Sequence, residues 1–470
     1  MKIQLALIVN ILSLNLLAQN SNDNWYFGTG ASISFQGETP TVQNGNPSMV
    51  CLDNGASVSN PGTGELLFYS NGYQVWNKNH EVMPNGNGLL GHNSGGNCAY
   101  AVQNPGNPQQ FYLFTSDAWA GQNGIRYSIV DMSLDNGNGD IGLVKNEVLQ
   151  SPATEKILAV RHANGNDVWL VIHAWNSSNF YAYLISANGI SDNPVISNVG
   201  SVHSGGAGLN YNAAGQITIN DSNNKIACCI FHMGSVELFD FNNVLGTLSN
   251  PRVLNDQNAW GVAFSPNSDY LYVSHWGGST KNIIHQYDIS LANESEISES
   301  MTTLGGLSGP NGNYIGGYIQ KGRNNKIYVS QFQSNYLAEI QNPNLPAPQC
   351  SIASTAVNLD NGICQAGLPS QTNAKVGLVS TQNFSSLSVI NNFRIFPNPS
   401  SGIFFLENLN ENNEKFHIQV LNLNGQVIHQ KTILGEKVIM IDISHFPSGH
   451  YVLQLFSEKN RLFSTSILKE

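Results

Sequence analysis

The sequence predicts an all-β protein: a seven-bladed β-propeller followed by a small immunoglobulin-like β-sandwich. Three observations carry this prediction. The chain contains 45 glycines and only 11% charged residues, which favours short strands and tight turns over long solvated helices. Six segments repeat one strand–turn–strand plan. A further set of alternating strands follows a Ser/Asn-rich gap near the C-terminus.

The first residues predict an export signal. The segment "MKIQLALIVNILSLNLLAQN" has one lysine, a short apolar run and a small residue at Ala18. This pattern is typical of a secretory signal peptide, here residues 1–18. A membrane anchor is the alternative, but Asn10 and Asn15 interrupt the run. No later segment is apolar enough to suggest a transmembrane span. We therefore expect an exported chain in which disulfides can form.

The repeats occupy the region expected to form the propeller, residues 19–379. Each repeat has an apolar strand, a turn rich in Asn, Gly, Pro or Asp, a second apolar strand and one polar residue, as in "ILAVRHANGNDVWLVIH". These polar end points recur at intervals of 43–59 residues, and most precede a further strand pair. Four strands per ~40–50 residues is typical of a propeller blade. A solenoid is the alternative, but parallel β-helix repeats are shorter, and leucine-rich repeats need a ladder of Leu and Asn residues that this sequence lacks. We expect a seventh blade to combine residues 24–35 with 362–371, which would remove open sheet edges.

The polar end points are candidate binding residues. Because each ends the second strand of its repeat, we expect all of them on one face of the disc, with aromatic residues close behind. Zinc ligands lie ~2 Å from their ion, while equivalent points in adjacent blades lie about 10 Å apart, so these histidines predict no shared metal. A ring of polar tips and aromatic faces suits a sugar or an extended peptide, and hydrogen bonding at strand ends alone is the alternative. The candidates are Asn71, Asp117, His173, His232, His275, Gln331, Trp119, Trp175 and Trp276, with Tyr73 and Phe332 as further aromatic neighbours.

Two motifs are weak candidates for cofactor binding. "GNGLLG" (86–91) has the spacing of a phosphate-binding loop, but no helical pattern follows it, so we expect a turn. "DMSLDNGNGD" (131–140) offers oxygen ligands for calcium, although it fits no EF-hand register and an Asn-Gly hairpin explains it equally well. We expect no cofactor, with calcium at 131–140 as the alternative. The net charge of −11 without a basic stripe predicts no nucleic-acid partner.

The cysteines allow few cross-links. We expect a disulfide between Cys350 and Cys364, which bracket a loop before the closing blade, with Cys51 and Cys98 as a weaker second pair. The neighbouring cysteines at 228–229 lie in an apparent strand, so their side chains point to opposite faces and are expected to be buried thiols.

Four stretches of the propeller region are distinctive: "GELLFYSNGYQVWNKNHEVMPNG", "RYSIVDMSLDNGNGD", "EKILAVRHANGNDVWLVIH" and "WGVAFSPNSDYLYVS". Together they resemble a family of secreted Bacteroidetes propeller proteins, related loosely to WD-repeat-like and YVTN-type propellers. The resemblance covers most of residues 24–375. It implies the fold but no biochemical activity.

The last segment, residues 393–470, follows an expected linker at 380–392. It contains "FRIFPNPSSGIFFLE", "FHIQVLNLNGQVIHQ", "IDISHFPSGHYVLQLFS" and "ILKE", which resemble the type A C-terminal sorting domain of the type IX secretion system. An ordinary Ig-like binding module is the alternative. The resemblance implies the type IX machinery as a partner, a secreted or outer-surface location, and frequent cleavage of the tail. The matching positions are Pro397, Asn398, Pro399, Gly402, Asn424, Gly425, Gly449, Tyr451 and Lys469.

The sequence favours a non-catalytic function. No G-x-S-x-G elbow, metalloprotease motif or zinc-finger spacing occurs in the chain, and no catalytic residue can be assigned. We therefore expect a secreted or surface propeller that binds a glycan, a peptide or a partner protein. An exported polysaccharide hydrolase or lyase with its site on one propeller face is the alternative, because paired carboxylates converge only in the fold.

Overall fold

The computed structural model describes residues 20–370 and 393–469, apart from gaps at 38, 47, 311, 409–414, 423–426, 435 and 458–460. The expected signal peptide and linker lie outside the described residues. The described chain forms two compact units, one within residues 20–370 and one within 393–469. No helix in this part of the chain is both long enough and apolar enough to cross a membrane.

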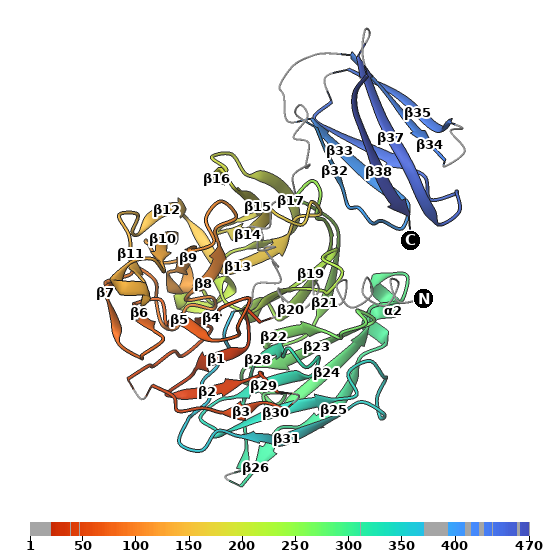
Figure 1. The fold of residues 1–470 in the computed structure, drawn as a ribbon. Helices are drawn as coiled ribbons and strands as arrows, with labels where there is room; N and C mark the ends of the chain where they lie inside the picture. The colour runs from red at the N-terminus through yellow and green to blue at the C-terminus, as the bar shows by residue number, and fades with distance from the viewer. Residues whose placement is uncertain are drawn as a thin grey trace, which may run out of the picture. The chain divides into compact units, whose positions relative to one another are not determined.

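The first unit is a β-propeller whose sheets lie around a common centre (Figure 1). Within the described residues, one three-stranded sheet comes first and six antiparallel sheets of four or five strands follow in chain order. The first four sheets comprise β1 (Asn24–Phe27), β2 (Ala31–Ser34) and β3 (Thr41–Val42); β4 (Ala56–Ser59), β5 (Leu66–Ser70), β6 (Gln74–Asn77) and β7 (Val82–Asn87); β8 (Tyr100–Gln103), β9 (Gln110–Ser116), β10 (Ile125–Asp131), β11 (Asp140–Ile141) and β12 (Glu147–Gln150); β13 (Ala153–Arg161), β14 (Val168–Ala174), β15 (Ser177–Ser186), β16 (Gly189–Ile190) and β17 (Val195–His203).

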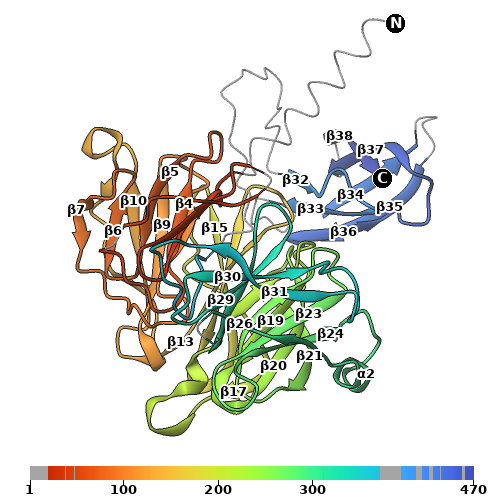
Figure 2. The same ribbon diagram turned by 90° about the horizontal axis from the view of Figure 1, so that it is seen from below.

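Three further sheets complete the unit, which also contains a short hairpin and the helix α2. The sheets comprise β18 (Ile217–Ile219), β19 (Lys225–Ile230), β20 (Ser235–Asn242) and β21 (Thr247–Asn255); β22 (Ala259–Phe264), β23 (Tyr270–His275), β24 (Ile283–Asp288) and β25 (Thr302–Gly306); β28 (Gly316–Lys321), β29 (Ile327–Gln331), β30 (Tyr336–Gln341) and β31 (Ser351–Asn358); the hairpin is β26 (Ser308–Gly309) with β27 (Gly312–Asn313), and α2 spans Glu294–Glu299. From below, β4–β6 and β20–β24 lie on opposite sides of the unit (Figure 2).

The second strand of each sheet is buried on both faces, because every sheet packs between two neighbours. In β14, Leu170 and Ile172 pack toward the sheet of β8–β10, whereas Trp169 and Val171 pack toward the sheet of β18–β21. The alternation of a β-strand therefore divides one apolar run between two cores. Gly165 supplies the positive φ of +76° in the turn before β14, a conformation that suits glycine.

Residues 362–370 meet the start of the propeller through isolated β-bridges rather than through a continuous strand pair. We predicted that residues 362–371 would pair as a strand with the first sheet, but the described part, 362–370, forms only isolated bridges, Thr29 with Ile363 and Ala56 with Ser370. The proline at 369 lacks the N–H that a continuing ladder requires. The blade count of seven stays a prediction.

The predicted Cys350–Cys364 disulfide is wrong: all six cysteines are free and buried. Cys350 belongs to the apolar core that contains Val329, while Cys364 belongs to the core that contains Tyr328, the residue before Val329. Successive residues of a strand face opposite ways, so the two sulfurs lie on opposite faces of the β28–β31 sheet.

The second pair of cysteines lies much closer together. The sulfurs of Cys51 and Cys98 are 3.3 Å apart in the interior of the propeller. The two residues remain thiols, and each donates toward a backbone carbonyl oxygen.

The second unit is a two-sheet β-sandwich. Alternate residues such as Phe416, Ile418 and Val420 point inward and form one core with residues from the facing sheet, including Phe404 and Leu406. The sheets have the orders β32-β33-β36 and β35-β34-β37-β38. Their strands are β32 (Phe393–Phe396), β33 (Ile403–Asn408), β34 (Lys415–Leu421), β35 (Val427–Leu434), β36 (Val438–Asp442), β37 (Gly449–Ser457) and β38 (Arg461–Lys469).

Some of the predicted sorting positions form hydrogen bonds that connect the last residues of the chain to the rest of the sandwich. The side-chain oxygen of Asn398 accepts a hydrogen bond from the Leu468 backbone at 2.7 Å, and the Lys469 ammonium donates to the Phe446 carbonyl at 2.5 Å. A Cβ at Gly402 would lie 2.6 Å from the Ser444 Cα at a φ of +121°, so only glycine fits there. Pro397 and Pro399 flank Asn398, while Gly449 and Tyr451 lie in β37; Asn424 and Gly425 lie outside the described residues.

Candidate functional site

The six predicted polar end points all lie at, or within two residues of, the end of the second strand of their sheets, as expected. Two of them cap the turns that follow. The Asn71 side-chain oxygen accepts from the backbone N–H groups of Tyr73 and Gln74, at 3.1 and 3.0 Å. The Asp117 carboxylate accepts from the Asn123 backbone at 3.0 Å. These side chains shape loops and are already hydrogen-bonded.

Two other end points are buried inside the propeller. Gln331 donates from Nε2 to the backbone carbonyls of Tyr336 and Ser354, at 2.9 and 2.7 Å. His173 is 0% exposed and stacks on His203, with ring centroids 3.7 Å apart. Burial lowers the pKa of His173 well below its usual value. Neither side chain can meet an external ligand.

His275 belongs to a buried hydrogen-bond network centred on Asp256. The Asp256 carboxylate contacts His275 Nε2 at 2.7 Å and His285 Nδ1 at 3.0 Å, and it accepts from the Tyr287 hydroxyl at 2.9 Å. His275 Nδ1 lies 3.1 Å from the Ile283 carbonyl oxygen. Burial alone would raise the pKa of Asp256, but hydrogen bonds from His275 and His285 outweigh it and lower the pKa to about 2. This network is structural.

An arc of aromatic rings passes over these strand ends. Each ring centroid lies 4.9–6.3 Å from the next, so the rings are in continuous contact. Most members are partly exposed, and Tyr73 at one end is 37% exposed. We call this set the aromatic arc. It consists, in spatial order, of Tyr73, His92, Trp119, Tyr211, Phe231, Trp260, Trp276 and Phe332.

The arc contains part of what the sequence predicted. Trp119 and Trp276 lie in the arc, as do the predicted aromatic neighbours Tyr73 and Phe332. Trp175 is only 8% exposed and, among the described residues, makes no ring contact with the arc. His232, the exposed end point, stacks on the arc residue Tyr211 with centroids 5.5 Å apart. Tyr211 lies in a 3₁₀ turn between sheets, η4 (Tyr211–Ala213), outside the repeat, which is why repeat-based reasoning missed it.

Trp119 is held in place from both sides of its backbone. It adopts a φ of +53° within the 3₁₀ turn η1 (Ala118–Ala120). Its N–H donates to the Glu155 carboxylate at 2.5 Å, and its carbonyl accepts from the Asn210 side chain at 3.2 Å. The other Glu155 oxygen accepts from the Gly96 N–H at 2.7 Å. A positive φ in a tryptophan is costly, so these contacts fix the ring position.

The carboxylates near the propeller centre are buried and do not resemble an open catalytic pair. Burial raises the pKa of Glu155 to about 7, and burial together with the Glu155 charge raises the pKa of Asp53 to about 7. Their exposures are 1% and 4%. Both Glu155 oxygens accept backbone hydrogen bonds, and with only 1% of the residue exposed the carboxyl group is out of reach of a bound polysaccharide.

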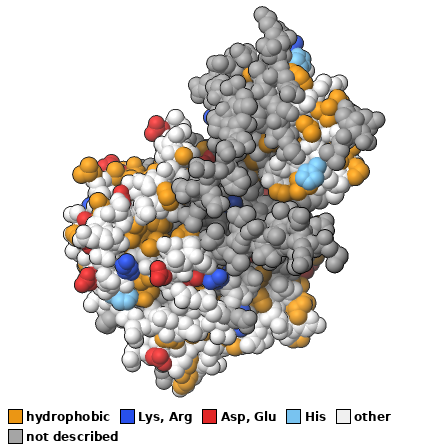
Figure 3. Space-filling view, in the orientation of Figure 1, with side chains coloured by type: hydrophobic (Ala, Val, Ile, Leu, Met, Phe, Trp, Pro, Cys, Tyr) orange, Lys and Arg blue, Asp and Glu red, His pale blue; other side chains and the backbone are white. Residues whose placement is uncertain are grey.

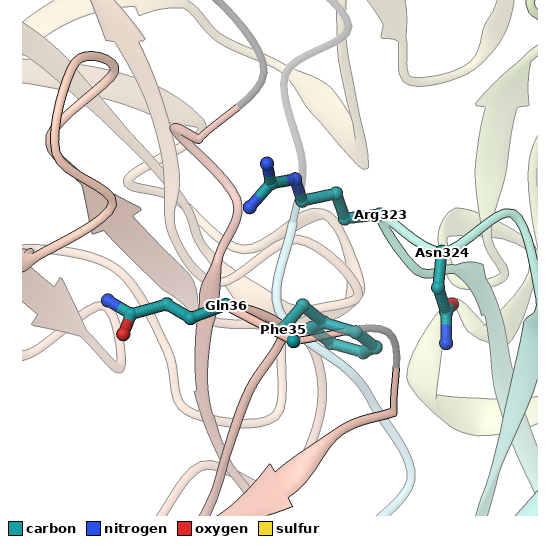
Figure 4. A pocket seen from close by; sticks show the side chains of 5 residues that line it. Phe35, Gln36, Arg323 and Asn324 are labelled. Atoms are coloured by element: carbon teal, nitrogen blue, oxygen red, sulfur yellow. The ribbon is translucent and has the colours of Figure 1, made fainter. Parts of the chain in front are cut away.

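A pocket lies elsewhere on the propeller, just after the end of β2 (Figure 4). Its volume is about 590 Å³. The Arg323 guanidinium at its edge is already paired with the Asp23 carboxylate, at 2.9 and 3.0 Å. The pocket therefore offers less for recognition than the aromatic arc. It is lined by Phe35, Gln36, Gly37, Arg323 and Asn324.

The two motifs considered for cofactors have structural roles. Strand β7 ends within 86–91, and the next element is strand β8 rather than a helix, so this segment is a turn. In 131–140, the Asp131 carboxylate accepts from Ser133, and Asp140 accepts from the Asn85 backbone and side chain. Calcium at this segment stays a prediction.

Comparison with known proteins identifies the second unit. Residues 394–469 match the family model described as the Secretion system C-terminal sorting domain. The C-terminal unit is therefore a type IX secretion sorting domain, as predicted, and the chain is a secreted or outer-surface protein. Among curated proteins, none is significantly similar to the chain.

Several solved structures are distantly similar to the chain. A protein from Lactobacillus plantarum has 12% identity over 83% of this chain and 98% of its own, with a TM-score of 0.38. A Quinonprotein alcohol dehydrogenase-like protein from Bacteroides thetaiotaomicron has 11% identity over 73% and 77%, with a TM-score of 0.41. Virginiamycin B lyase from Staphylococcus aureus has 9% identity over 72% and 87%, with a TM-score of 0.36. Likenesses this distant carry no argument about activity.

Proposed function

We propose that this exported propeller is a non-catalytic binding protein whose aromatic arc holds an extended, uncharged glycan. The observation that carries the proposal is the arc itself. Rings from loops and strand ends of several sheets form one continuous, partly exposed track. A track of this kind offers flat apolar faces to the C–H faces of successive sugar units.

The polar groups beside the arc support a neutral ligand. Histidine rings at His92 and His232 contact arc members and can exchange hydrogen bonds with hydroxyl groups. Charged side chains are sparse on the surface seen in Figure 3, in keeping with the 11% charged residues of the whole chain. A charged polysaccharide would instead favour a charged track.

The arc is also preorganised. Protein groups hold the backbone of Trp119, through its contacts with Glu155 and Asn210. Trp276 packs between Trp260 and Phe332, with centroids 5.4 and 4.9 Å away. Rigid rings lose little entropy when a ligand binds, so they contribute more of their contact energy to affinity.

A glycan array tests the proposal. The full-length chain should bind neutral oligosaccharides, and replacing both Trp119→Ala and Trp276→Ala should weaken binding about tenfold or more, because aromatic anchors dominate such interfaces. Tyr270→Ala is the matched control, since Tyr270 begins β23 and lies at the opposite end of that strand from Trp276. Binding that survives the double change, or binding of peptides only, would contradict the proposal.

A further inference from the structure

We propose that the seam between the β13–β17 and β18–β21 sheets contains a zinc-binding site formed by His203, Cys228 and Glu237. One ligand atom from each residue lies within 4.8 Å of the others, and all three side chains are completely buried. The site is separate from the aromatic arc and does not depend on the proposed glycan function.

Strand geometry brings the three residues together. Cys228 and Glu237 are directly opposite each other in the β19–β20 ladder, so their side chains leave the same face of the sheet. His203 is the last residue of β17, in the neighbouring sheet. His203 Nε2 lies 3.4 Å from Glu237 Oε2. With zinc bonds of about 2.0–2.3 Å, tetrahedral ligand atoms lie roughly 3–4 Å apart, so little movement is needed.

The donor set favours zinc. A cysteine sulfur, an imidazole nitrogen and a carboxylate oxygen are the three ligand types that zinc takes in proteins. The Glu237 carboxylate is also oriented for the task, because its Oε1 accepts from the Ser201 backbone at 2.7 Å and leaves Oε2 toward His203. Such outer contacts typically fix the ligands of a metal site.

Unpaired nitrogens at the site provide a second, independent observation. Among the described residues, His203 Nδ1 and both ring nitrogens of His173 are buried without a hydrogen-bond partner. His173 stacks on His203 with an interplanar angle of 21°. Leaving a buried polar group unpaired costs roughly 1–3 kcal/mol, so protein interiors seldom keep several together. His173 thus places unpaired nitrogens next to His203, outside the cluster of three ligand atoms.

The other buried cluster of this kind is different. Asp256, His275 and His285 also lie within 4.8 Å of one another, but short hydrogen bonds already connect them, and Tyr287 adds another. That cluster satisfies its own polar groups. The His203 cluster is more loosely paired: His203 Nε2 and Glu237 Oε2 are 3.4 Å apart, and His203 Nδ1 has no partner among the described residues.

The positive charge of the neighbouring Lys156 would repel a bound cation. Lys156 is buried near Cys228 and Glu237, but its ammonium donates to the carbonyl oxygens of Ala213 and Ala214, at 3.2 and 3.1 Å.

The adjacent cysteine gives a matched control. Cys228 packs in the seam with Val160 and Phe239, whereas Cys229 packs on the opposite face of the sheet with Val262 and Leu271. Both side chains are fully buried. Cys228→Ser should therefore remove a ligand, while Cys229→Ser changes an equally buried thiol on the other face of the sheet, away from the site.

Zinc and cobalt binding by the full-length chain test the proposal. The metal-free wild-type chain and Cys229→Ser should bind about one zinc ion, gain thermal stability and show a thiolate-to-cobalt charge-transfer band with Co²⁺. Cys228→Ser should lose the band and bind zinc at least about tenfold more weakly. Glu237→Gln should weaken binding and keep the band. A wild-type chain without the band, or an unchanged Cys228→Ser, would overturn the proposal whether or not any variant folds poorly.

Discussion

Replacing Asp256 by asparagine tests whether His275, a predicted binding residue, is structural. The Asp256 carboxylate is 4% exposed and contacts two histidines and one tyrosine hydroxyl. Asparagine has nearly the same shape but carries no charge, and its amide nitrogen would face a hydrogen-bond donor. We therefore expect Asp256→Asn to destabilise the propeller without altering a surface.

The pKa of Asp256 sets the magnitude. It falls from 3.8 to about 2 on folding, and each pKa unit corresponds to 1.36 kcal/mol, so the charged form contributes roughly 2–3 kcal/mol. Because the folded pKa lies below the unfolded one, this contribution is present above about pH 4 and is lost as the pH falls toward about 2. The loss of unfolding free energy caused by Asp256→Asn should therefore be full above about pH 4 and shrink as the pH falls toward about 2.

Denaturant unfolding of the full-length chain, followed by tryptophan fluorescence, measures the effect. Asp269→Asn is the control, because Asp269 is an exposed carboxylate in the turn before β23 of the same sheet. Asp256→Asn should lower the free energy of unfolding by about 2–3 kcal/mol at pH 7, by about half as much near pH 3 and by much less near pH 2. The reasoning is refuted if the two variants unfold alike at pH 7, or if the difference persists unchanged in acid.

Three further predictions concern charge, export and thiols. Burial raises the pKa of Asp53 from 3.8 to about 7, so its stabilising effect is present below about pH 4 and is lost as the pH rises through about 7; melting curves of Asp53→Asn should show weaker pH dependence. Deleting residues 393–470 should leave the propeller melting temperature nearly unchanged and trap the protein in the periplasm; normal surface display would contradict the sorting assignment. Mild oxidation should join Cys51 to Cys98, whose sulfurs are 3.3 Å apart, as peptide mapping can check.

The strand plan of the propeller was predictable because its signals are local. In "ILAVRHANGNDVWLVIH", two uninterrupted apolar runs on either side of an Asn-Gly turn predict two paired strands, and these residues form most of β13 and β14. The C-terminal motifs likewise predict the sorting domain, which the family match confirms.

The fate of individual side chains was not predictable from the repeat. His173, His232 and His275 occupy equivalent positions, yet His232 alone among them is exposed. The difference depends on partners from other segments: His203 stacks on His173, and Asp256 binds His275. Such tertiary partners leave no trace in a repeat pattern.

Proximity in sequence also misled the prediction of the disulfide. Cys350 and Cys364 are close along the chain but pack on opposite faces of one sheet. Cys51 and Cys98 lie in the loops before β4 and β8, far apart in sequence, and meet in the core. Pairing depends on which face each side chain occupies, and register sets that face.

Fluorine NMR of the chain labelled with fluorotryptophan tests the binding proposal most directly. The protein has seven tryptophans; Trp119, Trp260 and Trp276 lie in the aromatic arc, while Trp25 and Trp169 are buried in other cores. Saturation with the tightest-binding neutral oligosaccharide should shift the signals of the arc tryptophans and leave those of Trp25 and Trp169 in place. Shifts at Trp25 or Trp169 alone would contradict the assignment of the aromatic arc as the glycan-binding site.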